Sequence, residues 1–252
     1  MSLSKETSSV NQPLTPKSGK WLKRLSIFAF LILPLTVVGY RFGFYQFSTA
    51  LKLLAVSLLV AAITFLAGLF INLKQRNSDR YNSKQAQLAM YISLIPLFFL
   101  GSQVVTAKSF PVIHNISTDI VDPPRFNKIV ALRGTNSNSH LYNATEIGEI
   151  QKSAYPQIKT LIVTDSMNDA FNRSLSVTKK LGWDLVSSDQ QAGIIEASQT
   201  TKLWAFTDDV VIRISNVNDK TEIDLRSVSR VGRSDLGANA KRIDTFFKTY
   251  LE

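Results

Sequence analysis

Residues 210–244 read VVIRISNVNDKTEIDLRSVSRVGRSDLGANAKRID and contain, in order, a strand, a turn, a second strand and a helix. Apolar and polar side chains alternate in VVIRIS (210–215) and in TEIDLRSVSRV (221–231), and the polar residues NVNDK separate the two runs. Two alternating runs joined in this way are typical of an antiparallel hairpin. After them, Leu236, Ala240 and Ile243 recur at the spacing of one helix face, behind Ser234 as a capping residue. The stretch therefore predicts a hairpin followed by an amphipathic helix that closes the chain.

The region before this hairpin contains the same two kinds of element. Three short runs bounded by turn residues favour strands: TLIVT (160–164), WDLVSSD (183–189) and IIEASQTTKLWAF (194–206). Apolar residues at helical spacing follow a cap at Asp165 or Ser166 and stop at Gly182, and a short helix is expected around 144–152. This order predicts an α+β domain, in which two helices cover a curved antiparallel sheet.

Three uncharged apolar runs occupy the first part of the chain, at 25–40, 53–71 and 88–107. Each approaches the ~20 residues that a helix needs to cross the hydrocarbon core of a bilayer. They predict three transmembrane helices, in which Pro34 and Pro96 are tolerated because neighbouring helices can satisfy the freed carbonyls. A cleaved signal peptide is the alternative interpretation of the first run. The runs contain no ionisable residue for an ion pathway, which argues against a transporter.

Basic residues are concentrated in this first part. Residues 1–107 contain eleven lysines and arginines against two acidic residues, whereas residues 108–252 contain eighteen against seventeen. Lys17, Lys20, Lys23 and Arg24 precede the first run, and Lys74, Arg76, Arg80 and Lys84 separate the second from the third. Because basic loops stay in the cytoplasm, we expect an inner-membrane protein with a cytoplasmic N-terminus and an extracytoplasmic C-terminal domain. The near-neutral second part argues against a nucleic-acid partner.

We expect three regions: a disordered cytoplasmic tail (1–24), a three-helix transmembrane region (25–107) and an extracytoplasmic α+β domain (108–252). The chain has no cysteine, which excludes disulfides and thiolate chemistry. Its two histidines, His114 and His140, lack the spacing of a metal site, and no glycine-rich phosphate loop indicates a cofactor.

Strand alternation places charged side chains on one face of the sheet. Arg213 is opposite in parity to Val210, Ile212 and Ile214. The same reasoning collects Glu196, Arg213, Asp224, Arg226 and Arg230 on one face. One interpretation is a cross-strand ion network on a solvated face, in which each pair contributes little. The other is a functional anion site, in which arginines bind carboxylate or phosphate groups as bidentate clamps.

A second group of polar residues surrounds the last strand and helix. Asp208 and Asp209 point to opposite faces of a strand, so we expect them to pair with Arg213 or Arg226 rather than share a proton. Ser234 and Asp235 are expected to cap the helix, and Asn239 and Arg242 to hydrogen-bond back to the strand end; alternatively, Arg230 and Arg233 hold an anion with the free amides. The candidate binding residues are Asp208, Asp209, Arg213, Arg226, Ser229, Arg230, Arg233, Asp235, Asn239 and Arg242.

Several of these segments resemble a known family. They are FTDDVVIRI (206–214), DLRSVSRVGRSDLGANAKRI (224–243), IIEA (194–197), and IHNISTD and DPPRF within 113–126. Together they resemble the signature of the family of unknown function numbered 1499, over most of residues 110–251. The resemblance implies a domain that occurs in bacteria, often behind membrane helices, and in photosynthetic organisms, and it implies no activity. Asn115 follows the histidine at a place where the resemblance implies an aspartate.

Two functions remain open from the sequence. The first is a non-catalytic binding or structural module, anchored in the bilayer, that contacts an envelope lipid, glycan or protein through its arginine-rich face. The second is an envelope hydrolase or transferase that uses Asp208 or Asp209 with Arg226 and Arg230.

Overall fold

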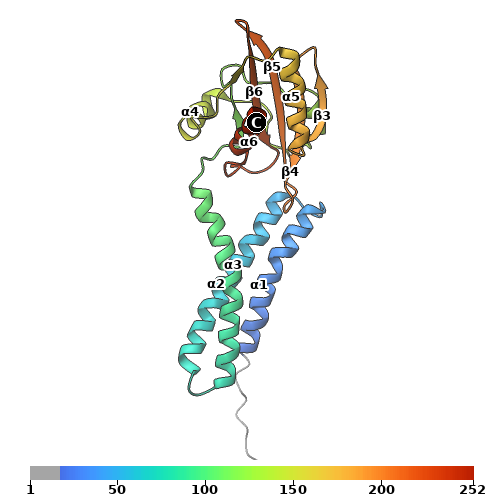
Figure 1. Cartoon of the computed structure of the whole chain (residues 1–252). Coiled ribbons are helices and arrows are strands. Elements are labelled where there is room, and N and C mark those ends of the chain that lie inside the picture. The colour runs from blue at the N-terminus through green and yellow to red at the C-terminus, as the bar shows by residue number, and fades with distance from the viewer. Residues whose placement is uncertain (1–17) are drawn as a thin grey trace, which may run out of the picture. The chain divides into compact units, whose positions relative to one another are not determined.

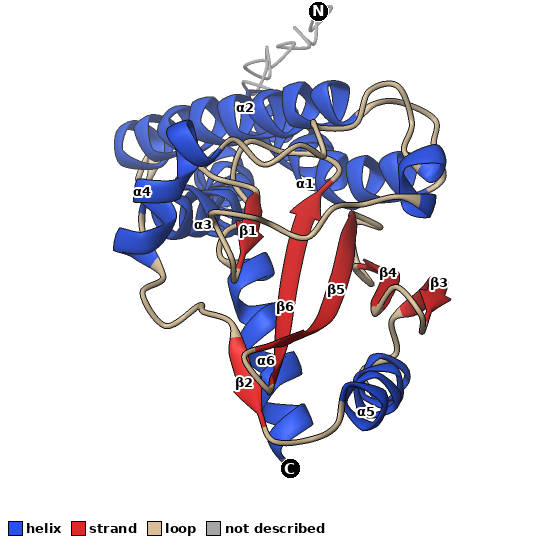
Figure 2. Ribbon diagram, turned by 90° about the horizontal axis from the view of Figure 1, so that it is seen from above, coloured by secondary structure: helices blue, strands red, loops and turns tan. Residues whose placement is uncertain are grey.

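The computed structural model describes residues 18–252, and the predicted hairpin forms the centre of its sheet (Figure 2). Strands β5 (Thr207–Val217) and β6 (Lys220–Ser229) pair antiparallel, with Asp208 opposite Ser229 at one end and Val217 opposite Lys220 at the other. Both residues of the turn, Asn218 and Asp219, have positive φ (51° and 59°), as a type I′ turn requires. The hairpin prediction is confirmed.

Four further strands complete an antiparallel sheet of six strands. They are β1 (Asn115–Ser117), β2 (Leu161–Val163), β3 (Asp184–Asp189) and β4 (Ile194–Thr200). The order is β1-β6-β5-β4-β3, and β2 also pairs with β6. Since β1 pairs with residues 226–228 and β2 with residues 221–223, the two short strands lie one after the other along the same edge of β6 (Figure 2).

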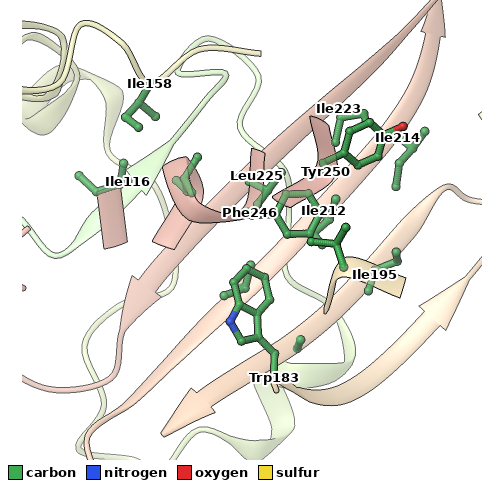
Figure 3. Packing of buried hydrophobic residues seen from close by; sticks show 14 of the residues in the cluster. Ile116, Ile158, Trp183, Ile195, Ile212, Ile214, Ile223, Leu225, Phe246 and Tyr250 are labelled. Atoms are coloured by element: carbon green, nitrogen blue, oxygen red, sulfur yellow. The ribbon is translucent and has the colours of Figure 1, made fainter. Parts of the chain in front are cut away.

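Helices α5 (Met167–Lys180) and α6 (Ala238–Leu251) cover one face of this sheet, and a shorter helix, α4 (Ala144–Ala154), precedes β2. In Figure 3, Phe246 and Tyr250 of α6 lie over side chains of β5 and β6, and Trp183 stacks on Phe246 with ring centroids 5.6 Å apart. The cluster includes Ile116, Phe171, Ile195, Val210, Ile212, Ile214, Ile223, Leu225 and Ile243, all buried. The predicted α+β class is confirmed.

The strand predicted to run from 194 to 206 is shorter than expected, because β4 ends at Thr200. Residues 201–206 form a turn instead, in which Thr201 donates from its amide to the carbonyl of Phe206 (2.8 Å). The Thr201 hydroxyl accepts from the Phe206 amide (3.0 Å), and Ala205 adopts a left-handed φ of 55°. Residues 201–206 contain no glycine, proline or asparagine, the residue types from which a turn is usually predicted.

The other face of the sheet is also covered, by residues 118–142, which we call the covering segment. The segment contains a short 3-10 helix, η1 (Lys128–Leu132), and its side chains Phe126 and Ile129 pack on Val211 and Val228 of the sheet. The expectation of a solvated polar face is therefore wrong. Helical periodicity in the sequence predicts α5 and α6, which cover the first face. The covering segment is irregular and has no periodic pattern of apolar residues.

Three long apolar helices precede the domain: α1 (Ser18–Arg41), α2 (Phe47–Gln75) and α3 (Arg80–Lys108) (Figure 1). Each is long and apolar enough to cross a membrane. Because α1 begins at Ser18, residues 18–24 are helical rather than part of a disordered tail, and the rest of that predicted tail lies outside the described residues. The described residues divide into two compact units, 18–102 and 103–252.

Small and hydroxyl side chains lie where the apolar helices meet. The Ser57 hydroxyl donates to the carbonyl of Ala29 (2.7 Å), and the hydroxyls of Thr64 and Ser93 are 2.6 Å apart. The hydroxyls of Ser57, Thr64 and Ser93 thus find partners within the helices, and small residues let helix backbones approach closely.

Candidate functional site

The sheet register places Asp208 and Asp209 on opposite faces. Asp208 pairs with Ser229, on the face that α5 and α6 cover, whereas Asp209 pairs with Val228, on the face under the covering segment. The two carboxylates therefore belong to separate clusters, as predicted from their adjacency on a strand. Neither binds Arg213 or Arg226, so that pairing prediction is wrong.

The first cluster joins Asp208 to α6 through Arg242. Arg242 donates from Nη2 to Asp208 Oδ2 (2.6 Å), from Nη1 to Ser227 Oγ (2.9 Å) and from Nε to Gln199 Oε1 (2.8 Å). Asn239 Oδ1 accepts from both Arg242 and the Ser227 hydroxyl. Asn239 Nδ2 donates to Ser229 Oγ (3.0 Å) and to the carbonyl of His114 (2.9 Å). Asn239 and Arg242 thus bond back to the strand end, as predicted.

Asp235 takes up the free amides at the start of α6. Its carboxylate accepts from the amides of Gly237 (2.9 Å) and Asn239 (3.0 Å). Burial raises the pKa of Asp235 above its ordinary value, although these amide bonds oppose the rise. The Ser234 hydroxyl donates to the carbonyl of Pro111 (2.9 Å) instead of capping the helix, so Asp235 performs that role. The Asp235 carboxylate therefore already binds the amides that, in the alternative prediction, hold an anion together with Arg230 and Arg233.

The second cluster is centred on Asp209, whose side chain has no exposed surface. Arg230 donates to it from Nε (3.1 Å) and Nη2 (2.8 Å), and Arg133 of the covering segment makes a further ion pair. The same two arginines also bind backbone of the covering segment: Arg230 Nη1 bonds Leu132 O (3.1 Å), and Arg133 Nη2 bonds Asn138 O (2.7 Å). This arrangement fixes the covering segment to the sheet.

Arg213 forms a third cluster with three carboxylates. It donates to Asp224 (2.9 Å), Asp119 (3.0 Å) and Asp122 (2.9 Å), the last two from the covering segment. Burial would lower the pKa of Arg213, but the carboxylates outweigh burial and raise it. Asp224 also accepts from the hydroxyls of Thr118 (2.8 Å) and Thr160 (2.6 Å). Arg213 is therefore neutralised within the domain.

Glu196 caps η1 from the neighbouring sheet. Its carboxylate accepts from the amides of Asn127 (2.6 Å) and Lys128 (2.8 Å) and from the Ser187 hydroxyl (2.9 Å). The Asn127 side chain makes no cap of its own. A buried carboxylate on β4 thus satisfies the amides that the short helix leaves free.

Arg226 differs from the other buried arginines because none of its hydrogen-bond partners is a carboxylate. It donates from Nε to Asn115 Oδ1 (3.0 Å), from Nη1 to Pro124 O (3.1 Å) and from Nη2 to His140 O. The rings of Phe126 and Tyr142 lie against its guanidinium, with centroids 5.2 and 5.5 Å away. Burial lowers the pKa of Arg226 to about 10, so it is still charged at neutral pH.

Residues 115–249 match the profile of a family described as protein of unknown function (DUF1499). The chain belongs to this family. The match begins at the first residue of β1 and ends within α6, so the DUF1499 domain comprises the sheet and both of its covers and excludes α1, α2 and α3. A comparison with curated proteins found no match.

One open pocket of the DUF1499 domain lies beside Arg226. It has a volume of about 620 Å³, and its polar lining residues are His114, Asn115, Asn138, Ser139, Tyr142, Asn143, Glu146 and Arg233. Asn115 and Tyr142 separate the pocket from Arg226, which both of them contact. Arg233, a predicted binding residue, is exposed at its rim and has no ion pair within residues 18–252. Of the ten predicted residues, Arg233 reaches this pocket directly and Arg226 lies behind its wall.

Two further pockets lie elsewhere on the DUF1499 domain. One, of about 860 Å³, borders Arg242 and includes Trp183, Lys202 and Lys241. The other, of about 820 Å³, borders Arg213 and includes Arg125 and Lys128. Across residues 18–252, no group of three histidine or carboxylate side chains is arranged to hold a metal ion.

Sequence reasoning missed the partners that the covering segment supplies, chiefly Arg133, Asn138 and Tyr142. All three lie in a stretch without apolar periodicity; Asn138 bonds backbone carbonyls, and Arg133 a carboxylate, far away in sequence. Such bonds leave no pattern in the sequence.

Proposed function

We infer that the protein is a membrane-anchored module that binds an anionic group of an envelope component outside the cytoplasm. The observation that carries this proposal is Arg226, a buried cation without an acidic partner beside an open polar pocket. Arg133, Arg213, Arg230 and Arg242 each pair with a carboxylate inside the domain, and Arg133 and Arg230 share that of Asp209. Arg226 is left with neutral acceptors and two aromatic rings.

An unpaired buried charge is costly, and three neutral hydrogen bonds offset this cost in part. An anion in the neighbouring pocket would interact electrostatically with Arg226 and balance its charge. Asn115 and Tyr142 would lie between the two charges. Arg233 at the rim adds a cation that can bind such a group directly. Glu146 also lines the pocket, where Asn143 Nδ2 donates to it (2.9 Å), and its negative charge opposes an anion bound close to it.

The geometry favours binding over hydrolysis or group transfer at Asp209. A general acid or base must reach its substrate, whereas the Asp209 side chain is fully buried and held by two arginines. The placement outside the cytoplasm rests on the basic residues before α1 and between α2 and α3. A fluorescent or protease-sensitive reporter fused after Glu252 tests it, and a reporter that behaves as a cytoplasmic protein would reverse the orientation.

The binding proposal is tested on the full-length protein in lipid nanodiscs, with inorganic phosphate and citrate as probes. An anion that binds the folded state raises the thermal midpoint of the domain. Asn115→Asp places a carboxylate beside Arg226, so this variant should be more stable without probe and should no longer respond to it. Arg233→Ala should respond more weakly than the parent protein.

Arg125→Ala is the matched control, because Arg125 is an exposed arginine beside a different pocket. It should respond to the probes as the parent does. The proposal fails if neither probe shifts the midpoint, or if the shift is the same in Asn115→Asp, Arg233→Ala and Arg125→Ala. Where the parent responds, vesicles containing anionic lipid and soluble phosphorylated sugars then distinguish a lipid headgroup from a glycan as the source of the anion.

A further inference from the structure

The strand register defines two ends of the DUF1499 sheet. At one end lie Asn115, Thr200, Thr207 and Ser229, since Thr200 pairs with Thr207 and the Ser229 amide bonds the carbonyl of His114 (2.9 Å). We call it the near end, because the chain enters the sheet there after α3. The β5–β6 turn at 218–219 and the β3–β4 turn at 190–193 lie at the opposite, far end.

The near end is tied closely to a helix that can cross a membrane. Helix α3 ends at Lys108 and β1 begins at Asn115. Even fully extended, the residues between them span roughly 25 Å at the reach of a polypeptide chain. The linker therefore keeps Asn115 within roughly 25 Å of the end of α3.

Apolar side chains are exposed at this near end. Val112, Leu203 and Leu236 are exposed to 64%, 59% and 39%. Leu203 belongs to the β4–β5 turn, where the rings of Trp204 and Phe206 stack with centroids 5.6 Å apart. Tryptophan and phenylalanine beside leucine and lysine are the composition of segments that settle in the interfacial layer of a membrane.

Two of these near-end segments have strained backbones. Ala205 and Leu236 adopt left-handed φ angles of 55° and 53°, which cost a residue with a side chain about 1–2 kcal/mol. The other non-glycine residues with positive φ within 18–252 are Asn218 and Asp219 of the type I′ turn, where these residue types fit. Unexplained strain that holds apolar residues at the surface points to a functional contact.

Charge also differs between the two ends. Exposed Lys202, Arg233 and Lys241 lie at the near end, together with the acidic residues Asp184 and Glu146. The far end has Asp165, Asp169, Asp189, Asp219 and Glu222, with Lys220 in the turn and Arg173 beside Tyr250. An anionic lipid surface attracts the first end and repels the second.

We propose that the near end of the DUF1499 domain inserts into the interfacial layer of the bilayer that carries the protein, through Val112, Leu203, Leu236 and the Trp204–Phe206 ring pair. Lys202 and Lys241 strengthen the contact when the lipids are anionic. The domain then has a fixed orientation on the membrane, with its acidic far end directed into the aqueous phase. This contact needs neither Arg226 nor a soluble ligand, and it shares Val112 with the lining of the anion pocket.

The absence of cysteine from the chain allows a direct test in the full-length protein. Leu203→Cys and Asp219→Cys place a spin label at the tips of two turns at opposite ends of the same strand, β5. In nanodiscs, the label at 203 should be severalfold more accessible to oxygen, which dissolves in lipid, than to a water-soluble nickel complex. The label at 219 should show the reverse preference.

Equal accessibility of the two labels to the nickel complex would overturn the proposal. A label at 203 shielded from both oxygen and nickel would also overturn it, because that result indicates a protein contact. A label at Leu236→Cys provides a second position, in case the turn tolerates the probe poorly. In anionic nanodiscs, the double variant Lys202→Glu and Lys241→Glu should reduce the preference of the label at 203 for oxygen over nickel. An unchanged preference would exclude a contribution of Lys202 and Lys241 to membrane contact.

Discussion

The two faces of the DUF1499 sheet are covered in different ways. On one face, α5 and α6 bury a continuous apolar cluster that contains Ile212, Leu225 and Phe246. On the other face, the covering segment buries a smaller cluster around Phe126 and Ile129, and charged side chains on the sheet bind its backbone and its ionic groups. The first cover depends on the area of apolar surface removed from water, and the second on the geometry of a few polar contacts.

This difference predicts how substitutions on each face destabilise the domain. Loss of apolar volume under α6 weakens the whole domain, because the helices and the sheet share one core. Loss of one carboxylate under the covering segment leaves a cation unpaired and frees a specific stretch of chain. Substitutions on the two faces should therefore differ in where the structure opens as well as in how much stability is lost.

The largest effect is expected from Phe246→Ala on the helix-covered face. Phe246 is fully buried between Trp183 and Tyr250, so its truncation should lower the free energy of unfolding by about 3–5 kcal/mol. Urea unfolding of the full-length protein in detergent micelles, followed by circular dichroism, measures the change. Leu251→Ala, on the same helix but exposed, is the control and should change stability by less than about 0.5 kcal/mol.

Asp209→Ala should come next, at about 3 kcal/mol, because it leaves Arg133 and Arg230 without their carboxylate. Hydrogen exchange should locate the damage: amides of residues 127–138 exchange faster, while those of α6 change little. Uniformly faster exchange in both regions would show that the two covers do not fail independently. Asp244→Ala, which breaks an exposed pair with Lys248, should cost less than about 0.5 kcal/mol.

Glu196→Gln sharpens the same comparison with a smaller change. The amide keeps one acceptor for the amides of Asn127 and Lys128 but loses its charge, so stability should fall by about 1–2 kcal/mol. Faster exchange at the start of η1 is the expected signature. An effect no larger than that of Glu149→Gln, an exposed carboxylate on α4, would contradict the capping role.

Leu236→Gly should leave the fold about 1 kcal/mol more stable than Leu203→Gly does, because glycine adopts the left-handed φ of position 236 without strain. The same change removes an apolar side chain from the near end, so spin labels at 203 should lie less deeply in lipid. Leu203→Gly removes a comparable side chain where no positive φ is found, and it should not stabilise. A gain in stability at both positions would show that strain at 236 is not the cause.

The smallest effect is a dependence on pH from Asp235. Burial raises its pKa in the folded state, so the folded protein binds this proton more tightly than the unfolded protein does. Its contribution to stability is therefore greatest below the ordinary pKa of 3.8 and falls as the pH rises through the raised value. Asp235→Asn lacks this proton, so the stability of the parent relative to the variant should decline over that range. A relative stability that rises with pH would contradict the assignment.

Much of the fold could be predicted because its elements have regular periods. The hairpin, α5 and α6 follow from alternation at two residues and recurrence near 3.6, and the same alternation correctly placed Glu196, Arg213 and Arg226 on one face. The paired prolines at 123–124 predict an extended strap packed along the domain surface for residues 110–126, but the rest of the cover on that face has no period and could not be predicted. Ser234 and Asp235 are both suitable acceptors, one position apart, so the sequence alone does not decide which of them caps the helix. The path of the chain decides it in favour of Asp235.

The candidate site was less predictable than the fold for the same reason. Arginines could be recognised in the sequence, but their partners could not, because whether an arginine is neutralised depends on contacts such as Arg133 with Asp209 that join distant segments. Arg226 and Arg213 are the same residue type, with the same charge and donors. They differ in their partners: Arg226 donates to Asn115, whereas Arg213 donates to Asp224.

The pairing of β1 with β6 has a consequence for how the chain is made. Asn115 is among the first residues of the domain to leave the ribosome, and its partner Val228 is among the last. The edge of the sheet cannot close, and α6 cannot dock, until residues 220–251 have been synthesised. The nascent domain is therefore expected to remain unfolded until then, and a chain truncated before residue 220 should be degraded by proteases.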